Sequence, residues 1–283
     1  MNIKITECPR DAMQGIVHFI PTDVKAAYIN LLLQVGFDTI DFGSFVSAKA
    51  IPQLQDTAVV LSKLDLSNTR SKLLAIVANY RGAEEAVKHP EITYLGYPFS
   101  ISETFQLRNT NTTLPQAFDN VKRMQELSIA NNKKLLVYLS MGFGNPYGDE
   151  WNTAIIHEWT DKLVGEGIHN IALADTIGIA DAAQIGSIYP DLCRQFPQTE
   201  FGIHLHSTPD TWQPKIAAAY QSGCKRFDTA LKGYGGCPMA TDDLTGNIAT
   251  ENLIDYLKSQ NELLGLNFDK LQEALDYSGK VFL

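Results

Sequence analysis

The fold is decided by residues 200–230, which read EFGIHLHSTPDTWQPKIAAAYQSGCKRFDTA. An apolar run over 200–206 is followed by an amphipathic segment over 211–222, and a second apolar run covers 225–230. A strand, a helix and a second strand in this order form a βα unit, whose strands lie parallel in one sheet. The stretch therefore predicts a parallel α/β architecture.

The same unit recurs along the whole chain. Eight apolar runs predict strands over 2–7, 37–42, 72–77, 92–97, 134–140, 169–174, 200–206 and 225–230. The first predicted helix starts at a capping Asp23 and ends at Gly36. Further helices are predicted over 115–131, 153–165, 181–195, 211–222 and 250–262, and a last one near 268–280.

Two folds can hold eight βα units, a closed (β/α)8 TIM barrel and a doubly wound open sheet. The 283 residues match the roughly 250 of a barrel that runs as one unit. The chain lacks the Gly-x-Gly-x-x-Gly and Walker motifs of nucleotide-binding open sheets. We therefore predict an α/β (β/α)8 TIM barrel with an additional C-terminal helix, as a single domain over residues 1–283, and keep the open sheet as the alternative.

Composition argues against several classes of partner. A formal net charge of −9 at pH 7 argues against nucleic acid, because phosphate binding relies on clustered Lys and Arg. No run approaches the roughly 18 apolar residues of a membrane span, and no signal peptide is recognisable. The four cysteines form no C-x-x-C pair and suggest reduced thiols. These features predict a cytoplasmic protein with no membrane partner.

The pair His204-Leu205-His206 is the first candidate for a metal site. Alternate side chains of a strand point to one side, so the two imidazoles lie about 6 to 7 Å apart along the chain. One ion can then take both rings. Two such histidines can equally be hydrogen-bonded core residues, so the pair alone leaves both interpretations open.

Other unusual residues are predicted at the same end of the barrel. Those at or just after predicted strand ends are Arg10, Asp11, Asp41, Asp175, Thr176 and the loop from Gly233 to Pro238. In TIM barrels, chemistry lies where strands end and βα loops begin, so the clustering favours a metal site. Two imidazoles with the Asp11 carboxylate suit an octahedral divalent cation, Mg²⁺ or Mn²⁺, with positions left for a substrate.

Arg10 and Cys237 suggest two further roles. Arg10 can stabilise an oxyanion or bind a carboxylate, although a simple ion pair with a neighbouring acid is the alternative. Cys237 lies in a Gly-rich loop that can act as a lid, and its thiol suggests proton transfer. An ordinary buried cysteine is the alternative. The other cysteines, including Cys8, are interpreted as packing residues.

The chain resembles the 3-hydroxy-3-methylglutaryl-CoA lyase branch of the DRE-TIM metallolyases, metal-dependent TIM barrels that make or break carbon–carbon bonds next to a carbonyl. No single motif is specific, but their order along the chain is. The motifs are Glu7-Cys8-Pro9-Arg10-Asp11-Ala12-Met13-Gln14, Ser44-Phe45-Val46-Ser47, Ser102-Glu103-Thr104-Phe105, Asp175-Thr176-Ile177-Gly178, His204-Leu205-His206, Gly235-Gly236-Cys237-Pro238 and Gly246-Asn247.

The resemblance implies roles for individual residues. The implied metal ligands are Asp11, His204, His206 and Asn247. Arg10 corresponds to the residue that stabilises the enolate, and Cys237 to the lid thiol. The expected substrate contacts are Gln14, Ser44 and Thr176. Asp41 and Asp175 both remain candidates for the general base.

The implied function is divalent-metal-dependent cleavage of a 3-hydroxy-3-methylglutaryl-CoA-like thioester to acetyl-CoA and acetoacetate. The partner is then a small-molecule acyl-CoA thioester, and the family suggests a homodimer. Lys49, Arg108 and Lys232 are candidate contacts for the CoA phosphates. One alternative is an aldolase or synthase acting on a 2-oxo acid or another 3-hydroxyacyl-CoA, which Ala12-Met13 disfavours. A barrel that has lost catalysis and serves in binding is the other.

Four departures from the family pattern bear on the substrate. Asp41 stands where these lyases usually carry Glu, one methylene longer. Gly15-Ile16-Val17 replaces Asn-Glu-Lys near the expected mouth, and Ser207 replaces an Asp after the histidine pair. The interval from Cys237 to Asn247 is one residue longer than usual. These changes leave the metal ligands in place. They can, however, alter which substrate is bound.

Overall fold

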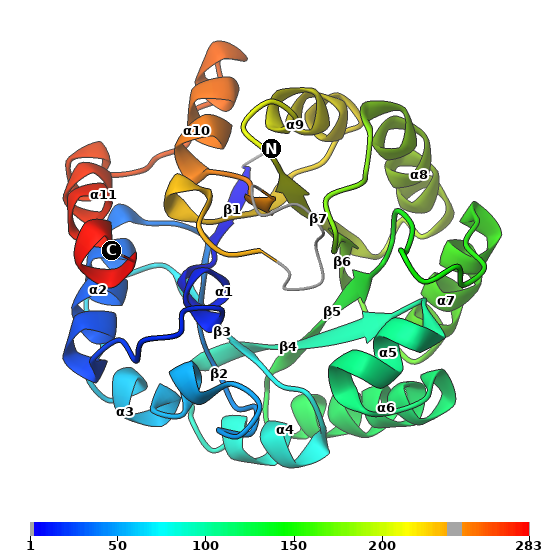
Figure 1. Ribbon diagram of the computed structural model, residues 1–283, viewed down its shortest axis with the longest axis horizontal. Helices are drawn as coiled ribbons and strands as arrows, with labels where there is room; N and C mark the ends of the chain where they lie inside the picture. The colour runs from blue at the N-terminus through cyan, green and yellow to red at the C-terminus, as the bar shows by residue number, and fades with distance from the viewer. Residues whose placement is uncertain (1–2, 237–244, 283) are drawn as a thin grey trace.

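The structure is a computed structural model that describes residues 3–236 and 245–282. Eight parallel strands follow one another in the order β6-β5-β4-β3-β2-β1-β8-β7, and a β6–β7 pairing closes the ring. Figure 1 shows this barrel end on, with helices around it. The predicted (β/α)8 barrel is confirmed, and the open sheet is wrong.

Strands and helices alternate as predicted. The barrel strands are β1 (Lys4–Glu7), β2 (Thr39–Ser44), β3 (Lys72–Ile76), β4 (Ile92–Ser100), β5 (Lys134–Ser140), β6 (Asn170–Asp175), β7 (Glu200–Ser207) and β8 (Arg226–Thr229). The helices are α1 (Pro9–Gln14), α2 (Thr22–Val35), α3 (Thr57–Leu61), α4 (Tyr80–Ala86), α5 (Glu103–Thr110), α6 (Leu114–Ala130), α7 (Thr153–Gly165), α8 (Ala182–Gln195), α9 (Trp212–Gln221), α10 (Thr250–Ser259) and α11 (Phe268–Phe282). Two 3-10 turns, η1 (Pro52–Leu54) and η2 (Leu231–Gly233), and a short strand β9 (Gly246–Asn247) complete the list.

Several predicted boundaries are wrong; β4, for example, was predicted over 92–97 and extends to Ser100. The strand β2 extends to Ser44, so Asp41 lies inside the strand and not at its end. The helix α2 begins at Thr22 after Pro21, and no side chain caps it. Asp23 therefore lies in the first turn, where a negative charge still stabilises the helix dipole.

The two faces of the strands bury different clusters. Alternate side chains of a strand point to opposite faces, so each strand contributes to both. The larger cluster packs between the strands and the surrounding helices. The small cluster comprises Leu74, Ile76, Tyr94, Leu136, Tyr138 and Ala172. On β7, Gly202 leaves room for a neighbouring side chain, because a Cβ there would lie 3.1 Å from Cγ of Arg226.

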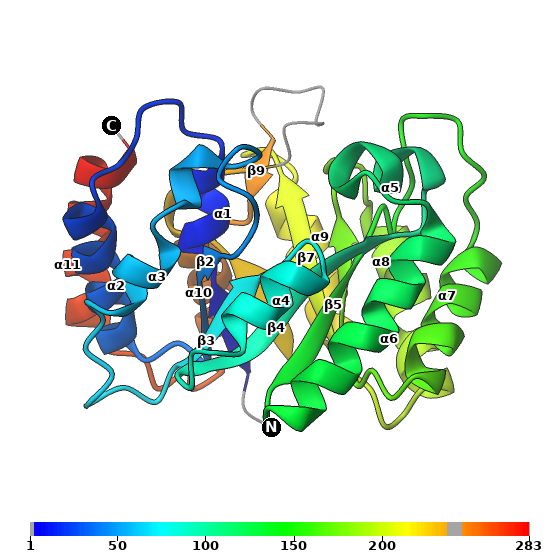
Figure 2. The ribbon, with the colours of Figure 1, turned by 90° about the horizontal axis from the view of Figure 1, so that it is seen from below.

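The additional C-terminal helix is confirmed as α11. It lies beside α2 in both ribbon views (Figures 1 and 2). Tyr28 of α2 stacks on Tyr277 at 6.5 Å and meets the edge of Phe282 at 5.8 Å between ring centroids. Figure 2 shows β9 at one end of the barrel. Among the described residues, no helix combines the length and apolarity needed to cross a bilayer.

Candidate active site

A cavity of about 480 Å³ is lined by residues from the carboxyl ends of the strands and the loops that follow them. This volume is in the range of small-molecule sites. Six of the predicted site residues line it, namely Arg10, Asp11, Gln14, Thr176, His204 and His206. Segments far apart in sequence therefore meet at one rim, as the strand order predicts.

Asp11 lies in the first turn of α1, which begins at Pro9 directly after β1. Its Oδ1 accepts hydrogen bonds from Arg10 Nη1 at 3.0 Å and Gln14 Nε2 at 2.9 Å. Its Oδ2 accepts one from Asn247 Nδ2 at 2.7 Å. Burial alone would raise the pKa of Asp11, but the charge of Arg10 and the nearby imidazoles outweigh it and lower the pKa to about 2. Asp11 is thus a carboxylate at neutral pH.

The backbone fixes the orientation of the His206 ring. Nδ1 lies 2.9 Å from the carbonyl oxygen of Asp175 and 3.1 Å from that of Thr176. Carbonyls only accept, so Nδ1 carries the proton and Nε2 the lone pair. Nε2 is buried and has no hydrogen-bond partner among the residues that the structure describes. Burial, reinforced by the charge of His204, lowers the pKa of His206 and favours this neutral ring.

His204 faces a carboxylate that the sequence did not single out. Its Nδ1 lies 3.4 Å from Oδ2 of Asp228, the residue paired with it across β7 and β8. Burial opposes charging of the ring, but Asp228 outweighs burial and raises the pKa of His204. A proton on Nδ1 facing Asp228 leaves the lone pair on Nε2, the arrangement by which carboxylates orient metal-binding histidines.

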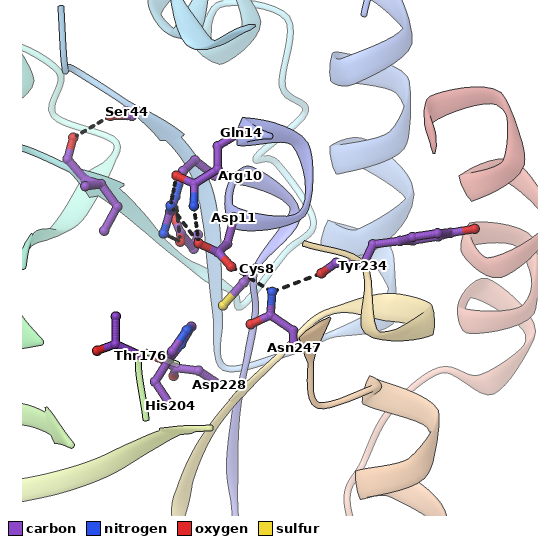
Figure 3. Close-up of polar contacts among 12 residues, drawn as sticks. Cys8, Arg10, Asp11, Gln14, Ser44, Thr176, His204, Asp228, Tyr234 and Asn247 are labelled. Carbon is purple, nitrogen blue, oxygen red and sulfur yellow. Dashed lines mark hydrogen bonds and ion pairs between the residues drawn. The ribbon is translucent and has the colours of Figure 1, made fainter. Parts of the chain in front are cut away.

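Asn247 reaches the site through β9, which pairs antiparallel with the end of β7 and aligns Asn247 with His206. Its Nδ2 donates to Asp11 and to the carbonyl of Tyr234, at 2.7 and 2.9 Å (Figure 3). Its Oδ1 is buried and accepts no hydrogen bond from residues 3–236 or 245–282. Donating with the amide leaves the carbonyl oxygen as a free ligand atom.

These groups fit a divalent cation. Ligand atoms of Asp11, His204 and His206 all lie within 4.8 Å of one another. Buried polar atoms normally have partners, so the unpartnered His206 Nε2 and Asn247 Oδ1 require an explanation. A cation bound by one carboxylate, two imidazoles and one amide oxygen would explain these unpartnered atoms. The mixed set of N and O ligands suits Mg²⁺ or Mn²⁺.

Arg10 and Asp41 form a buried forked ion pair. Arg10 donates from Nε at 3.0 Å and from Nη2 at 2.6 Å to Oδ2 of Asp41. Its Nη1 binds both Asp11 and Gln14. Burial raises the pKa of Asp41 to about 6, even though Arg10 acts in the opposite direction. Arg10 is therefore paired with neighbouring acids, as the second interpretation predicts, and it also lines the cavity.

Asp175 is held differently. Its Oδ2 accepts from Nζ of Lys215 and its Oδ1 from the backbone N–H of Ala180, at 2.8 and 3.0 Å. Lys215 also donates to the carbonyls of Gly178 and His206. Asp175 does not line the cavity, whereas the next residue, Thr176, does. The Asp175 carboxylate thus joins the ends of β6 and β7 to α9.

The three expected substrate contacts lie differently with respect to the cavity. Thr176 borders the cavity, and its Oγ1 accepts from the N–H of Met141 at 2.8 Å. Ser44 is buried behind the cavity wall, where its hydroxyl donates to the carbonyl of Ile76 at 3.2 Å. Gln14 lies on the wall but is engaged by Arg10 and Asp11. These local hydrogen bonds could not be predicted from the sequence.

The two cysteines of interest differ. Cys237 lies outside the described residues. Cys8 is buried, and its Sγ has a long contact of 3.7 Å to the carbonyl of Thr6. Burial, followed by the charges of Asp228 and Asp41, holds the pKa of Cys8 well above its usual value. Cys8 packs as predicted, but its thiol also points toward the predicted ligands in Figure 3.

A closed barrel with ligand-type and ionisable side chains around a cavity at the strand ends is the arrangement of TIM-barrel enzymes. The family model HMGL-like matches residues 2–277, and the chain belongs to this family. The resemblance inferred from the motifs is thus confirmed.

The chain is similar to named lyases over almost its whole length. It is 31% identical to the mitochondrial hydroxymethylglutaryl-CoA lyase of Mus musculus over 97% of this chain and 84% of that protein. The crystal structure of Bacillus subtilis HMG-CoA lyase has a TM-score of 0.93 and 30% identity, covering 99% of this chain and 94% of that one. An HMG-CoA lyase from Acinetobacter baumannii in complex with coenzyme A and 3-methylmalate has a TM-score of 0.91 and 30% identity, covering 99% and 91%.

Proposed function

We propose that this chain is a divalent-metal-dependent carbon–carbon lyase that cleaves a 3-hydroxy-3-methylglutaryl-CoA-like thioester to acetyl-CoA and acetoacetate. The observation that carries the proposal is the group formed by Asp11, His204 and His206, whose ligand atoms lie within 4.8 Å of one another beside the cavity. Family membership and the lyase names of the relatives support the reaction type. None of these relatives is named as a synthase.

The proposed ligands are Asp11, His204, His206 and Asn247, with Mg²⁺ or Mn²⁺ as the proposed ion. When bound, the cation would act as a Lewis acid that lowers the pKa of the substrate hydroxyl. The chain keeps the ligand atoms ready for it. Asp11 is ionised, and the backbone carbonyls of Asp175 and Thr176 aim the His206 lone pair into the site.

Arg10 is the proposed stabiliser of the thioester enolate. Four of its five N–H groups are directed at Asp41, Asp11 and Gln14. The remaining N–H, on Nη2, has no partner within residues 3–236 and 245–282. Its neighbours fix the guanidinium before the substrate arrives, so little reorganisation is needed when negative charge develops.

Of the two candidates for the general base, the contacts favour Asp41. Its pKa of about 6 is close to neutral pH, where proton transfer is efficient. Neither carboxylate lines the cavity, but Asp41 is held by Arg10, which does line it, whereas Asp175 is held by Lys215 and the N–H of Ala180. We assign Asp175 a positioning role through Lys215 and the end of β7.

The cavity wall also suits an acyl-CoA. The lining beyond the ligands is largely apolar and includes Val46, Ile51, Ile76, Pro98 and Phe105. Arg108 supplies a cation on the same wall, with its guanidinium carbon 4.7 Å from the ring centroid of Tyr147. We propose that Gln14 and Thr176 contact the acyl group, that Ser44 supports the wall, and that the Cys237 thiol delivers the final proton.

The deciding experiment is a substrate panel with Mg²⁺ or Mn²⁺, scored for acetyl-CoA. The panel contains 3-hydroxy-3-methylglutaryl-CoA, another 3-hydroxyacyl-CoA, and a 2-oxo acid with acetyl-CoA. We expect acetyl-CoA release from the first substrate and its loss in Asp11→Asn. Release from none of them would refute the lyase assignment, and consumption of acetyl-CoA with the 2-oxo acid would favour a synthase.

We also propose that the protein is a cytoplasmic homodimer. The dimer follows from the family resemblance alone, and the free thiols of Cys8, Cys193 and Cys224 are consistent with a reducing compartment. Size-exclusion chromatography with light scattering should give twice the 31.3 kDa chain mass. A monomeric mass would exclude the dimer, and cell fractionation tests the location.

A further inference from the structure

Beneath the proposed metal ligands lies a second group of buried polar atoms that make no hydrogen bonds to the described residues. Both carboxylate oxygens of Asp228 lack such a bond within residues 3–236 and 245–282, and Asp228 is only 3% exposed. Nδ1 of His204 forms a 3.4 Å ion pair with Oδ2 of Asp228 but likewise has no hydrogen bond in the described part of the chain. Buried ionised groups are costly unless they are paired or bind a metal. The ion pair between His204 and Asp228 lacks hydrogen-bond geometry, so the space on the Nδ1 side of His204 can hold a ligand.

Cys8 completes this group. Its Sγ, a nitrogen of His204 and a carboxylate oxygen of Asp228 lie within 4.8 Å of one another. The three residues come from the end of β1 and from adjacent positions on β7 and β8. Figure 3 shows the Cys8 sulfur directed toward the space between Asn247 and Asp228. Among the described residues, the thiol has only the long contact to a carbonyl, so a cation would not have to displace a strong hydrogen bond there.

We propose that Cys8, His204 and Asp228 form an inner site for a thiophilic divalent cation such as Zn²⁺ or Cd²⁺. One sulfur, one nitrogen and one oxygen suit these ions, whereas Mg²⁺ prefers oxygen. Ligand atoms around a tetrahedral zinc lie about 3.5 Å apart, so adjustments of roughly 1 Å by the side chains suffice. The cation replaces the thiol proton of Cys8, which is released to solvent.

The inner site is coupled through His204 to the outer ligand set, which is the proposed catalytic metal site of Asp11, His204, His206 and Asn247. A neutral imidazole has a single lone pair, on either Nδ1 or Nε2. Binding at the inner site uses the lone pair on Nδ1 and leaves the ring proton on Nε2, which then cannot bind the outer cation. A thiophilic ion is therefore an antagonist of the catalytic metal. This coupling, unlike the inner site itself, rests on the proposed function.

Cadmium titration of the chelator-treated full chain tests the inner site, because a Cd²⁺-bound thiolate gives an ultraviolet charge-transfer band. A Cys237→Ala background removes the thiol of the Gly-rich loop. We expect one equivalent of Cd²⁺ to produce the band in this background and in its Cys193→Ser derivative, which removes a half-buried cysteine on α8. Adding Cys8→Ser should abolish it. A band that persists without the Cys8 thiol, or no band in the background, overturns the site.

A second variant keeps the test decisive if Cys8→Ser does not fold. Asp228→Asn retains the thiol but weakens a ligand, so the Cd²⁺ affinity should fall by about tenfold or more. Unchanged affinity there contradicts the proposal. The coupling is tested by Mn²⁺ titration, in which one bound Cd²⁺ should weaken Mn²⁺ binding by about tenfold or more, but only when Cys8 is present. If the protein gave the cadmium band but bound no Mn²⁺, the proposed ligand set of Asp11, His204, His206 and Asn247 would be refuted. The inner site would still be supported.

Discussion

The guanidinium of Arg10 and the carboxylate of Asp41 form a fork in which Nη2 lies 2.6 Å from Oδ2. The pair joins α1, which carries Asp11, to the interior of β2. A lysine has the charge but not the planar geometry that serves Asp41, Asp11 and Gln14 at once. The site therefore fixes the orientation of the Arg10 guanidinium as well as its charge.

We expect Arg10→Lys to lower kcat by about 10² to 10³ while largely preserving Mn²⁺ affinity, because an enolate-stabilising donor is lost and the ligands remain. Steady-state kinetics with calorimetric Mn²⁺ titration separates the two effects. A parallel loss of metal affinity would show that Arg10 acts mainly by holding Asp11.

Asp228→Asn should weaken Mn²⁺ binding by about 10- to 100-fold, because the amide no longer supports the charge and tautomer of His204. Calorimetry or Mn²⁺ paramagnetic resonance measures the change. The matched control is Asp56→Asn, which removes a carboxylate paired with the buried Lys25 away from the site. Equal losses in both variants would point to a general effect on stability.

Asn247→Asp should destabilise the metal-free protein by roughly 2 kcal/mol, because it sets a second carboxylate against Asp11 where an amide N–H now donates at 2.7 Å. Added Mn²⁺ should narrow the difference in Tm, since the cation separates the two charges. Melting curves with and without metal test this. If the difference in Tm did not change with Mn²⁺, Asn247 would not be a ligand.

Lys215→Met should lower the free energy of unfolding by about 3–5 kcal/mol, because it leaves the buried carboxylate of Asp175 without its cation. Adding Asp175→Asn to this variant should recover part of the loss. Urea unfolding of the single and double variants measures the coupling energy. Additive effects would mean that the ion pair contributes nothing beyond its separate members.

Glu7 should give stability a dependence on pH. Burial raises its pKa from 4.5 to about 8, although Thr250 and the N–H of Leu231 act in the opposite direction. The folded state then holds a proton that the unfolded chain has released, so stability falls as the pH rises from about 4.5 through 8. Unfolding curves of Glu7→Gln should show a smaller fall over this window. The control Glu126→Gln, at an exposed acid on α6, should keep the wild-type slope, and identical slopes in all three proteins would contradict the shift.

The barrel was predictable because its signal is periodic. Eight apolar runs separated by amphipathic segments recur along the chain, and strand ends in a parallel barrel share one rim. Arg10, Asp11, Thr176 and the two histidines were therefore predicted to meet, and they all line one cavity. Boundaries were less accurate, as the position of Asp41 inside β2 illustrates.

The partners that orient the site were not predictable. Asp228 lies within the strand-like run RFDT, where a single acid gives no periodic signal, and only the register of β7 against β8 brings it to His204. Lys215 lies on α9, and its reach to Asp175 depends on how that helix packs. Asn247 was inferred from the resemblance alone, because β9 has only two residues. Contacts across the barrel follow from tertiary geometry, which local sequence does not contain.

The hydrogen bond between Asp11 and Asn247 spans 236 residues of sequence. If these two side chains bind the cation together, a growing polypeptide on the ribosome has an incomplete ligand set until translation has passed residue 247. Complete binding of the metal then follows the synthesis of all eight barrel strands. Chains cut short before Asn247 would leave the ribosome without a complete ligand set, whatever the concentration of metal in the cell.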